Sequence, residues 1–442
     1  MELYSECKDY KLYHGNMLDM LKVIKPNSID SIITDPPYEL NFMGKSWDNS
    51  GIAFQKETWE KCFSVIKWGG YLLAFGGSRT YHRIACAIED AGFEIRDCIM
   101  YLYGSGFPKG MNIGLAIDKR NGVESEVIGG NFEIKEAQNK WKGWNTQLKP
   151  AYEPIIVAQK PVKKSIIDNV LEYGVGGLNI DECKVGNETI KGGTMPIMNG
   201  GEEGVCNFKT VGAERIERED SIGRYPSNVI HDGSDEAIKD MPNTKSTYNE
   251  DGKHEKDIHR QNFEFLKYGY KERFETGFND EGSASRYFYC AKASAKDRDE
   301  GLDDFEEKEF KSALNTKNGT GERLDGGKTP LRRNTHTTVK PTQLMQYLVR
   351  LVSPKGATIL DVFNGSGSTG KVVMFENKER NANYKYIGIE LTEEYLPISK
   401  ARIEYVINND FDFWKDENGK TQYEKFNKTN QLSLFDFLGG TA

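Results

Sequence analysis

Short apolar runs alternate with segments of helical spacing in the first third of the chain. The runs at 29–33, 71–75 and 99–103 have the length of buried strands and are bounded by Gly, Pro or Asp. Between them, residues 57–67 and 81–91 repeat their apolar positions with the period of an amphipathic helix. Strands that alternate with helices predict a parallel sheet covered by helices.

The same alternation returns near the end of the chain. A helical pattern at 343–352 is followed by a strand-like run at 358–362 and by a Gly/Ser loop at 364–370 that opens another helix. A second strand-like run at 386–389 precedes a helical stretch that ends near residue 407. The two parts therefore look like halves of one α/β core that are separated in the sequence.

The block between these halves differs from them in composition and periodicity. Between about residues 160 and 335, paired glycines, many Asn residues and mixed charges replace clear periodicity. We therefore expect four regions, namely a first half of the core at 1–160, an inserted region at 161–334, a second half of the core at 335–407 and a polar, flexible tail at 408–442.

Composition narrows the class of protein. Of the 442 residues, 37% are hydrophobic and 29% are charged, which suits a folded chain with a sizeable core. The mean hydropathy is −0.64, and no apolar run approaches the ~20 residues that span a bilayer. The first residues lack the basic flank and the apolar stretch of a signal peptide. We expect a cytoplasmic protein with no membrane contact.

The seven cysteines are odd in number and include no C-x-x-C pair. This pattern favours reduced thiols over a disulfide framework or a zinc knuckle. We expect no metal, and a composite site of Cys183, Cys206 and His231 is the alternative.

The net charge of −8 argues mildly against non-specific coating of DNA, because phosphate contacts need Lys or Arg on the binding face. Basic residues nevertheless concentrate between 311 and 340, where only Glu322 and Asp325 oppose them. A nucleic-acid surface is expected there. Its candidate phosphate contacts are Lys328, Arg332 and Arg333.

The sharpest chemical signal follows the first strand-like run, at Asp35-Pro36-Pro37-Tyr38. Two prolines fix the backbone and remove two N–H donors, so the loop presents a carboxylate, a free carbonyl and an aromatic ring. A planar exocyclic amine is a poor nucleophile because its lone pair is delocalised into the ring. Acceptors at Asp35 and at the Pro36 carbonyl can hold its N–H groups and favour a tetrahedral, nucleophilic nitrogen, while Tyr38 stacks on the base. A proline-rich turn with a capping Asp is the alternative interpretation.

A second signal is the run from Asp361 to Gly370, which ends a strand and opens a helix. Its glycines allow close backbone approach, and a helix N-terminus offers unpaired N–H groups. The run lacks the lysine of a phosphate-binding P-loop. About twenty residues further on, Glu390 ends the next strand, where an acid commonly holds ribose hydroxyls. The pair predicts a nucleoside cofactor site, with a tight structural turn as the alternative.

Together these motifs resemble those of the DNA amino-methyltransferases that use S-adenosylmethionine. The catalytic tetrapeptide comes first and the cofactor loop second, which resembles the order of the family's beta class, with target recognition between them. The resemblance covers about residues 10–160 and 335–407. It implies a Rossmann-like methyltransferase fold with a mostly parallel seven-stranded sheet and an inserted, irregular target-recognition region.

The resemblance assigns catalysis to Asp35, Pro36, Pro37 and Tyr38. It places Asn16 where the family usually has Asp, and the amide oxygen of Asn16 can still accept from an adenine amine. The residues that the resemblance assigns to S-adenosylmethionine are Asn16, Asp35, His336, Lys340, Asp361, Phe363, Asn364, Gly365, Ser366, Gly367, Ser368, Thr369 and Glu390.

Asp at the first motif position is typical of the N6-adenine enzymes of the family, whereas Ser is commoner in the N4-cytosine enzymes. The resemblance therefore implies site-specific methylation of N6 of an adenine flipped out of duplex DNA, in a bacterial or phage-infected cell. N4-cytosine methylation is the alternative, and a catalytically silent DNA- or clamp-binding adaptor is a further one. Members of this class often form homodimers.

Near the end of the chain, Gln431-Leu432-Ser433-Leu434-Phe435 resembles the pentapeptide by which bacterial DNA-processing proteins bind the replication sliding clamp. It follows a polar segment near the C-terminus, which is an accessible position for such a peptide. The alternative is an apolar tail that packs on its own domain.

Overall fold

The computed structural model describes residues 2–40, 50–106, 110–123, 126–128, 134–137, 139–190, 194–196, 215–217, 219–245, 281–291, 295–309 and 331–409. The chain divides into two compact units. The first consists of Met1–Glu182, Asn228–Lys239 and Cys290–Tyr423, and the second of Cys183–Ser227, Asp240–Tyr289 and Glu424–Ala442.

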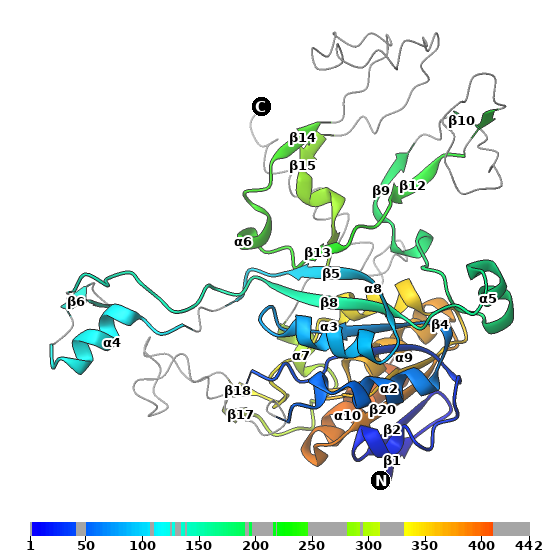
Figure 1. Cartoon of the computed structure of the whole chain (residues 1–442), viewed down its shortest axis with the longest axis horizontal. Helices are drawn as coiled ribbons and strands as arrows, with labels where there is room; N and C mark the ends of the chain where they lie inside the picture. The colour runs from blue at the N-terminus through cyan, green and yellow to red at the C-terminus, as the bar shows by residue number, and fades with distance from the viewer. Residues whose placement is uncertain are drawn as a thin grey trace, which may run out of the picture. The chain divides into compact units, whose positions relative to one another are not determined.

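A ten-stranded mixed sheet runs through the first unit (Figure 1). Its order in space departs from its order in the sequence, because the last two strands of the chain lie between β2 and β3. From one edge to the other the strands are β1 (Glu2–Glu6), β2 (Tyr10–His14), β20 (Lys385–Glu390), β19 (Thr358–Asp361), β3 (Ile29–Thr34), β4 (Ile66–Phe75), β8 (Tyr152–Gln159), β5 (Glu94–Leu102), β13 (Val229–His231) and β16 (Tyr289–Cys290).

The expected count of seven strands is wrong. Three strands are additional, and two of them, β13 and β16, lie within the block that the sequence marked as irregular. Their two or three residues are too short to show periodicity. In addition, β1 pairs antiparallel with β2, and β8 runs antiparallel to both β4 and β5. The strand β8 therefore runs against both of its neighbours.

The strand β3 explains how polar residues enter a buried parallel strand. All six of its residues are buried, and Ile29, Ile32 and Ile33 supply the branched side chains that favour this environment. The carboxylate of Asp30 accepts a hydrogen bond from the backbone N–H of Thr358 at 2.7 Å and pairs with Lys67 Nζ at 2.5 Å. These partners satisfy the charge that interrupts the apolar run.

Helices cover both faces of the sheet (Figure 1). On one face, Trp59, Ile84 and Ile88 pack in the same buried cluster as Ile32 and Leu72 of the sheet. The elements of that face are α1 (Met17–Met20), the 3₁₀ turn η3 (Ile52–Phe54), α2 (Lys56–Val65) and α3 (Tyr81–Asp90). On the other face, α8 (Thr342–Val352) contacts β3 and β4, α9 (Ser368–Arg380) contacts β19 and β20, and α10 (Leu396–Asn408) contacts β2.

The remaining described elements are short. Between β5 and β8 lie α4 (Ile113–Arg120), β6 (Glu126–Ile128) and β7 (Ile134–Glu136), and β8 is followed by α5 (Ile166–Tyr173) and η4 (Asp181–Cys183). Later elements are α6 (Asp235–Ile238), α7 (Ala295–Asp299), β17 (Lys308–Glu309), β18 (Leu331–Arg332) and η9 (Glu393–Tyr395). The second unit holds β9 (Val185–Ile190), β10 (Thr194–Pro196), β11 (Arg215–Glu217), β12 (Ser221–Arg224), β14 (Asn243–Lys245), β15 (Glu281–Ser283) and η7 (Ala284–Tyr287).

The direction of the strands positions the chemistry. Because β3, β4, β19 and β20 run parallel, their carboxyl ends meet at one edge of the sheet. The antiparallel β8 begins at that same edge. None of the described helices is long and apolar enough to cross a membrane.

Candidate active site

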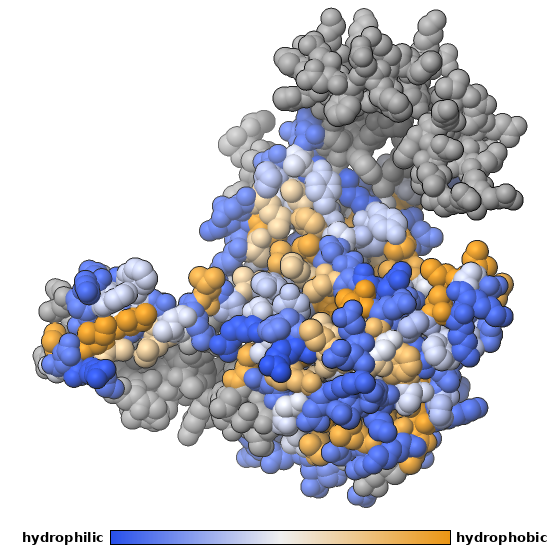
Figure 2. Space-filling model, in the orientation of Figure 1, coloured by the Kyte–Doolittle hydropathy of each residue, from blue (hydrophilic) through white to orange (hydrophobic). Residues whose placement is uncertain are grey.

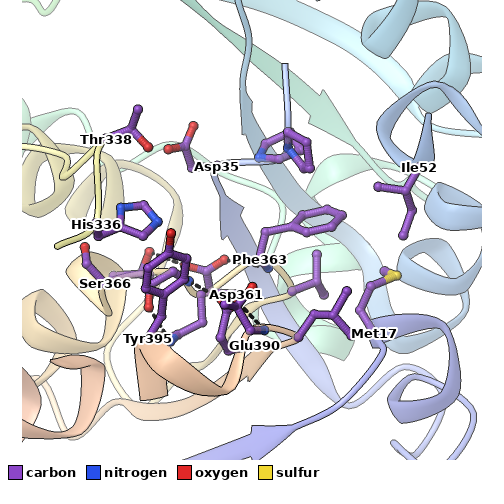
Figure 3. A pocket seen from close by; sticks show the side chains of 18 of the residues that line it. Met17, Asp35, Ile52, His336, Thr338, Asp361, Phe363, Ser366, Glu390 and Tyr395 are labelled. Atoms are coloured by element: carbon purple, nitrogen blue, oxygen red, sulfur yellow. Dashed lines mark hydrogen bonds between the residues drawn. The ribbon is translucent and has the colours of Figure 1, made fainter. Parts of the chain in front are cut away.

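A cavity of about 490 Å³ opens at the carboxyl edge of the sheet (Figure 3). This volume is typical of small-molecule and cofactor sites. Its wall combines the loop after β3, the segment before α8, the loop between β19 and α9, and the residues after β20. In Figure 3 the acidic residues Asp35, Asp361 and Glu390 lie between His336 on one side and Met17 and Ile52 on the other.

The Asp35-Pro36-Pro37-Tyr38 loop lies directly after β3, and all four residues line the cavity. The hydroxyl of Thr80 donates to the Tyr38 carbonyl at 2.8 Å and fixes the end of the loop. One carboxylate oxygen of Asp35, Oδ2, lies 3.0 Å from Lys340 Nζ. The other, Oδ1, is buried and has no hydrogen-bond partner among the described residues. A buried acceptor at the cavity is thus left for a ligand.

Lys340 lies against the Asp35–Tyr38 loop, although the resemblance placed it among the cofactor-binding residues. Its ammonium group contacts Asp35, donates to the Tyr38 hydroxyl at 3.0 Å and lies 3.3 Å from Glu153 Oε2. Burial acts to lower the pKa of Lys340. The Asp35 and Glu153 carboxylates raise it by more than burial lowers it, so the net shift is upward. The lysine therefore remains charged inside the protein.

The pKa of Asp35 is raised above its ordinary value. Burial is the largest cause, the Lys340 charge opposes it, and the Glu153 charge adds to it. Two carboxyl groups, those of Asp35 and Glu153, share the single cation of Lys340 in this half-buried cluster. Such a site suits a ligand atom on which positive charge develops.

Asp361 ends β19 beneath the Gly/Ser loop. Its Oδ1 accepts from the Thr34 hydroxyl at 2.7 Å and from the Phe363 N–H at 3.1 Å, and its Oδ2 accepts from the Thr369 hydroxyl at 2.7 Å. Burial raises the pKa of Asp361 to about 7 against these hydrogen bonds. The carboxyl group joins β3, β19 and the start of α9 into one frame.

The loop requires glycine at two positions. Gly365 has a φ of 51° and Gly367 a φ of 73°, a region that other residues rarely adopt. A Cβ on Gly365 would approach His336 Nε2 to 2.8 Å, and one on Gly367 would overlap Ser399. Gly367 is also the N-cap residue just before α9, and it has no side chain to cap the helix. The backbone therefore comes close to the cavity wall and leaves the helix start open.

Glu390 ends β20 and reaches the same loop. Its Oε2 accepts from the Gly365 N–H at 2.6 Å, and its Oε1 accepts from the Thr392 N–H at 2.8 Å. Burial raises its pKa, and these backbone donors oppose that shift. Each oxygen retains a further lone pair, so the carboxylate can still accept from hydroxyl groups in the cavity.

The other residues assigned to the cofactor divide by role. Asn16 caps α1, since its Oδ1 accepts from the Leu18 N–H at 2.9 Å, and it lines the cavity. Asn364 bonds Tyr386 and Ser399, which makes it part of the support of the loop. Ser366, Ser368 and Thr369 line the cavity, as does Phe363.

His336 lines the cavity as a neutral ring. Burial lowers its pKa to about 3, and the charges of Lys340, Arg402 and Arg298 lower it as well. Its Nδ1 is buried with no hydrogen-bond partner in the described part of the chain. Tyr395 meets the ring edge-on, with centroids 4.6 Å apart. A second unpartnered polar atom therefore belongs to the site.

A buried ionic cluster supports the loop from behind. Arg402 Nη1 donates to the Ser366 carbonyl at 2.8 Å and to the Ser368 hydroxyl at 3.2 Å. Lys371 Nζ pairs with Asp297 at 2.6 Å and with Glu300 at 2.7 Å. The charges of this cluster lower the pKa of Asp297 to about 2, although burial, the largest influence, acts to raise it.

Replacing Arg402 by Met is expected to destabilise the protein by about 3–5 kcal/mol, because buried acids then lose a cation. The Ser366 carbonyl also loses its donor, so S-adenosylmethionine binding should weaken. Lys400→Met is the matched control, since the Lys400 side chain is 41% exposed on the same helix and lies 3.9 Å from Glu404. Urea unfolding and calorimetric titration measure the two effects, and equal behaviour of the two variants would contradict the supporting role.

The structure describes only some of the residues expected to bind DNA or a partner protein. Arg332 lies in β18, and Arg333 pairs with Asp303 at 3.5 Å and Glu307 at 3.3 Å. Lys328 and the pentapeptide Gln431–Phe435 lie outside the described residues, as does Cys206. Among the side chains that are described, no three His, Cys, Asp or Glu residues are grouped to hold a metal ion.

Sequence reasoning missed Glu153 and Arg402. Glu153 comes second in β8, and nothing in its surroundings distinguishes it from a surface acid. Arg402 did carry a signal, because it stands midway between Ile398 and Val406 at intervals of four residues. A charged residue on the apolar face of a helix indicates a buried ion pair or a functional contact.

A family model and several curated proteins match the sequence of this chain. The family model N6_N4_Mtase, described as DNA methylase, matches residues 29–401. The Type II methyltransferase M.HindIII of Haemophilus influenzae is 24% identical over 266 residues, covering 50% of this chain and 77% of the relative. The Type II methyltransferase M2.LlaDCHI of Lactococcus lactis subsp. cremoris is 30% identical over 222 residues, covering 40% and 81%.

Solved structures add two distant likenesses. The cytosine-N4-specific PvuII DNA methyltransferase has 13% identity and a TM-score of 0.40, with 97% of this chain and 95% of that chain covered. The M1.HpyAVI-SAM complex has 14% identity and a TM-score of 0.35, with 89% and 99% covered. The family assignment rests on the sequence match, which spans both halves of the sheet. The chain therefore belongs to the N6_N4_Mtase family of DNA methylases.

Proposed function

We propose that this protein transfers a methyl group from S-adenosylmethionine to N6 of an adenine in duplex DNA. The observation that carries the proposal is the buried, unpartnered Oδ1 of Asp35 at the wall of the cavity. An exocyclic amine donates hydrogen bonds, and its nitrogen gains positive charge as it attacks. An anionic acceptor at this position favours that change.

The residues that line the cavity suit S-adenosylmethionine as the methyl donor. Glu390 offers carboxylate oxygens to ribose hydroxyls, and the open start of α9 offers N–H groups. S-adenosylmethionine supplies a methyl group on a positively charged sulfur. Carboxyl groups from three strand ends, those of Asp35, Asp361 and Glu390, suit a cation in this space.

The chain's own residues then prepare the amine. Lys340 binds Oδ2 of Asp35 and so turns Oδ1 to the ligand. Tyr38, whose hydroxyl Lys340 holds, presents its ring beside the cavity as a stacking surface for the base. The base must leave the duplex to reach a wall this deep.

The proposal is tested by expressing the chain in a bacterium that lacks DNA methylation and sequencing its DNA for modified bases. We expect N6-methyladenine at one recurring short motif, and none in cells that express the Asp35→Ala variant. If N4-methylcytosine occurs at such a motif instead, the target base is cytosine and not adenine. No modification from a folded protein that binds S-adenosylmethionine would overturn the enzymatic proposal and favour a DNA- or clamp-binding adaptor.

A further inference from the structure

A segment in the first core half combines lysines with exposed tryptophans. The chain leaves β5 at Leu102 and returns at Tyr152, the first residue of β8 (Figure 1). We call residues 139–150 the return segment, because they lead directly into β8. Both ends of the excursion lie at the carboxyl edge of the sheet, and Glu153 of the cavity wall follows three residues after Pro150.

The return segment has a defined conformation. The N–H of Ile113 donates to the Trp144 carbonyl at 3.0 Å, and the N–H of Thr146 donates to the Met111 carbonyl at 3.2 Å. Asn139 Nδ2 donates to the buried Asp118 at 2.6 Å and to the Gly114 carbonyl at 2.9 Å. These bonds fasten the segment to α4 and to the residues just before it. Its exposed side chains are therefore held in place.

Those side chains have one sign of charge. The sequence of the segment is NKWKGWNTQLKP, with lysines at 140, 142 and 149 and no acidic residue. Lys119 and Arg120 are exposed in the last turn of the neighbouring α4. The whole chain carries a net charge of −8, so this cluster stands out against an acidic background.

The aromatic side chains of the segment are unusually accessible. Trp141 is 36% exposed, Trp144 is 57% exposed, and their rings meet edge to face with centroids 5.2 Å apart. Lys140 Nζ lies 5.8 Å from the centre of the Trp141 ring. Figure 2 shows hydrophobic residues over α4 beside hydrophilic ones. Large aromatic rings that are exposed on an ordered, charged surface indicate a binding function.

We propose that the return segment is a DNA-contact surface for the same duplex whose base enters the cavity. This inference rests on the proposed function. Exposed lysines bind phosphates, and rings held beside them stack on bases that have left the helix. Lys140, Lys142 and Lys149 contact the backbone, and Trp144, the more exposed ring, packs on an unstacked nucleotide. The surface belongs to the catalytic half, outside the inserted region where recognition was expected.

The test measures binding of the full chain to a fluorescently labelled duplex by anisotropy, from about 50 to 200 mM salt. Replacing Lys140, Lys142 and Lys149 together by Ala should reduce the slope of log K against log salt by roughly 0.9 per lysine. Trp144→Ala should weaken binding by about fivefold or more at fixed salt and leave the slope unchanged.

The matched control replaces three lysines elsewhere, the exposed Lys22 and Lys56 and the half-buried Lys400, by Ala. It removes the same charge, and its salt slope should stay near that of the unchanged chain. Equal slopes for the two triple variants would overturn the proposal, as would wild-type binding by the return-segment variant. If that variant fails to bind while the unchanged chain methylates DNA, both proposals stand. If the unchanged chain neither binds nor methylates DNA, the proposed function fails and this inference fails with it.

Discussion

The Asp35→Ala protein is expected to bind S-adenosylmethionine within a few fold of the unchanged chain and to methylate DNA about 10³-fold more slowly. Asp35 presents its Oδ1 as a buried, unpartnered acceptor at the cavity. Without it the amine keeps its planar form, and the charge that develops on nitrogen loses its counterion. The expected loss therefore falls on the chemical step, since residues after β19 and β20 also line the proposed cofactor site.

Single-turnover methylation and calorimetric titration separate these two quantities. The variant should fold, because Lys340 retains Glu153 as a partner at 3.3 Å. Asp35→Asn is the control for shape, since it keeps an oxygen at nearly the same place and removes the charge. A loss of cofactor affinity as large as the loss of rate would contradict the role assigned to Asp35, as would rapid methylation by the Ala variant.

Much of the core could be predicted because local patterns determine it. Helices expected at 81–91 and 343–352 occur at Tyr81–Asp90 and Thr342–Val352. Residues that end parallel strands converge at one edge by geometry alone, which is why Asp361 and Glu390 meet the loop after β3. The helix expected at 57–67 ends earlier, at Val65, because β4 begins at Ile66.

The network behind Asp35 could not be read in the same way. Glu153 and Lys340 lie 187 positions apart, and they meet only because β8 enters the sheet against its neighbours and begins at the cavity. No sequence periodicity reports the direction of a strand. The family resemblance pointed to Lys340 as a cofactor residue, while the structure places its ammonium group 3.0 Å from the Asp35 carboxylate.

The Lys340 charge lowers the pKa of Asp35 and the Glu153 charge raises it. Replacing either residue should therefore shift the pH dependence of methylation. Methylation requires an ionised Asp35, so its rate should fall at low pH as that carboxylate takes up a proton. Lys340→Met removes the cation that holds the pKa of Asp35 down, so the acid limb of the rate profile should move to higher pH. The maximal rate should also fall by about 10²-fold, because Oδ2 loses the group that orients it.

Glu153→Gln should move the same limb to lower pH, because the Glu153 charge raises the pKa of Asp35. The amide keeps an acceptor for Lys340, so packing is preserved and the shift reports charge alone. Single-turnover rates measured across pH, with cofactor and DNA saturating, give the position of the acid limb for each variant. If the network had a merely structural role, both variants would methylate more slowly, but the acid limbs of their rate profiles would not move.

The double variant Lys340→Met with Glu153→Gln separates electrostatics from loss of structure. Lys340→Met alone leaves two buried carboxyl groups without their cation, which destabilises the fold. Removing the second acid in the same molecule should recover part of that stability and bring the acid limb back toward lower pH. Additive losses in the double variant would mean that the two residues act independently. If the acid limb of the pH–rate profile lies at the same pH in all three variants, the titrating group is a residue other than Asp35.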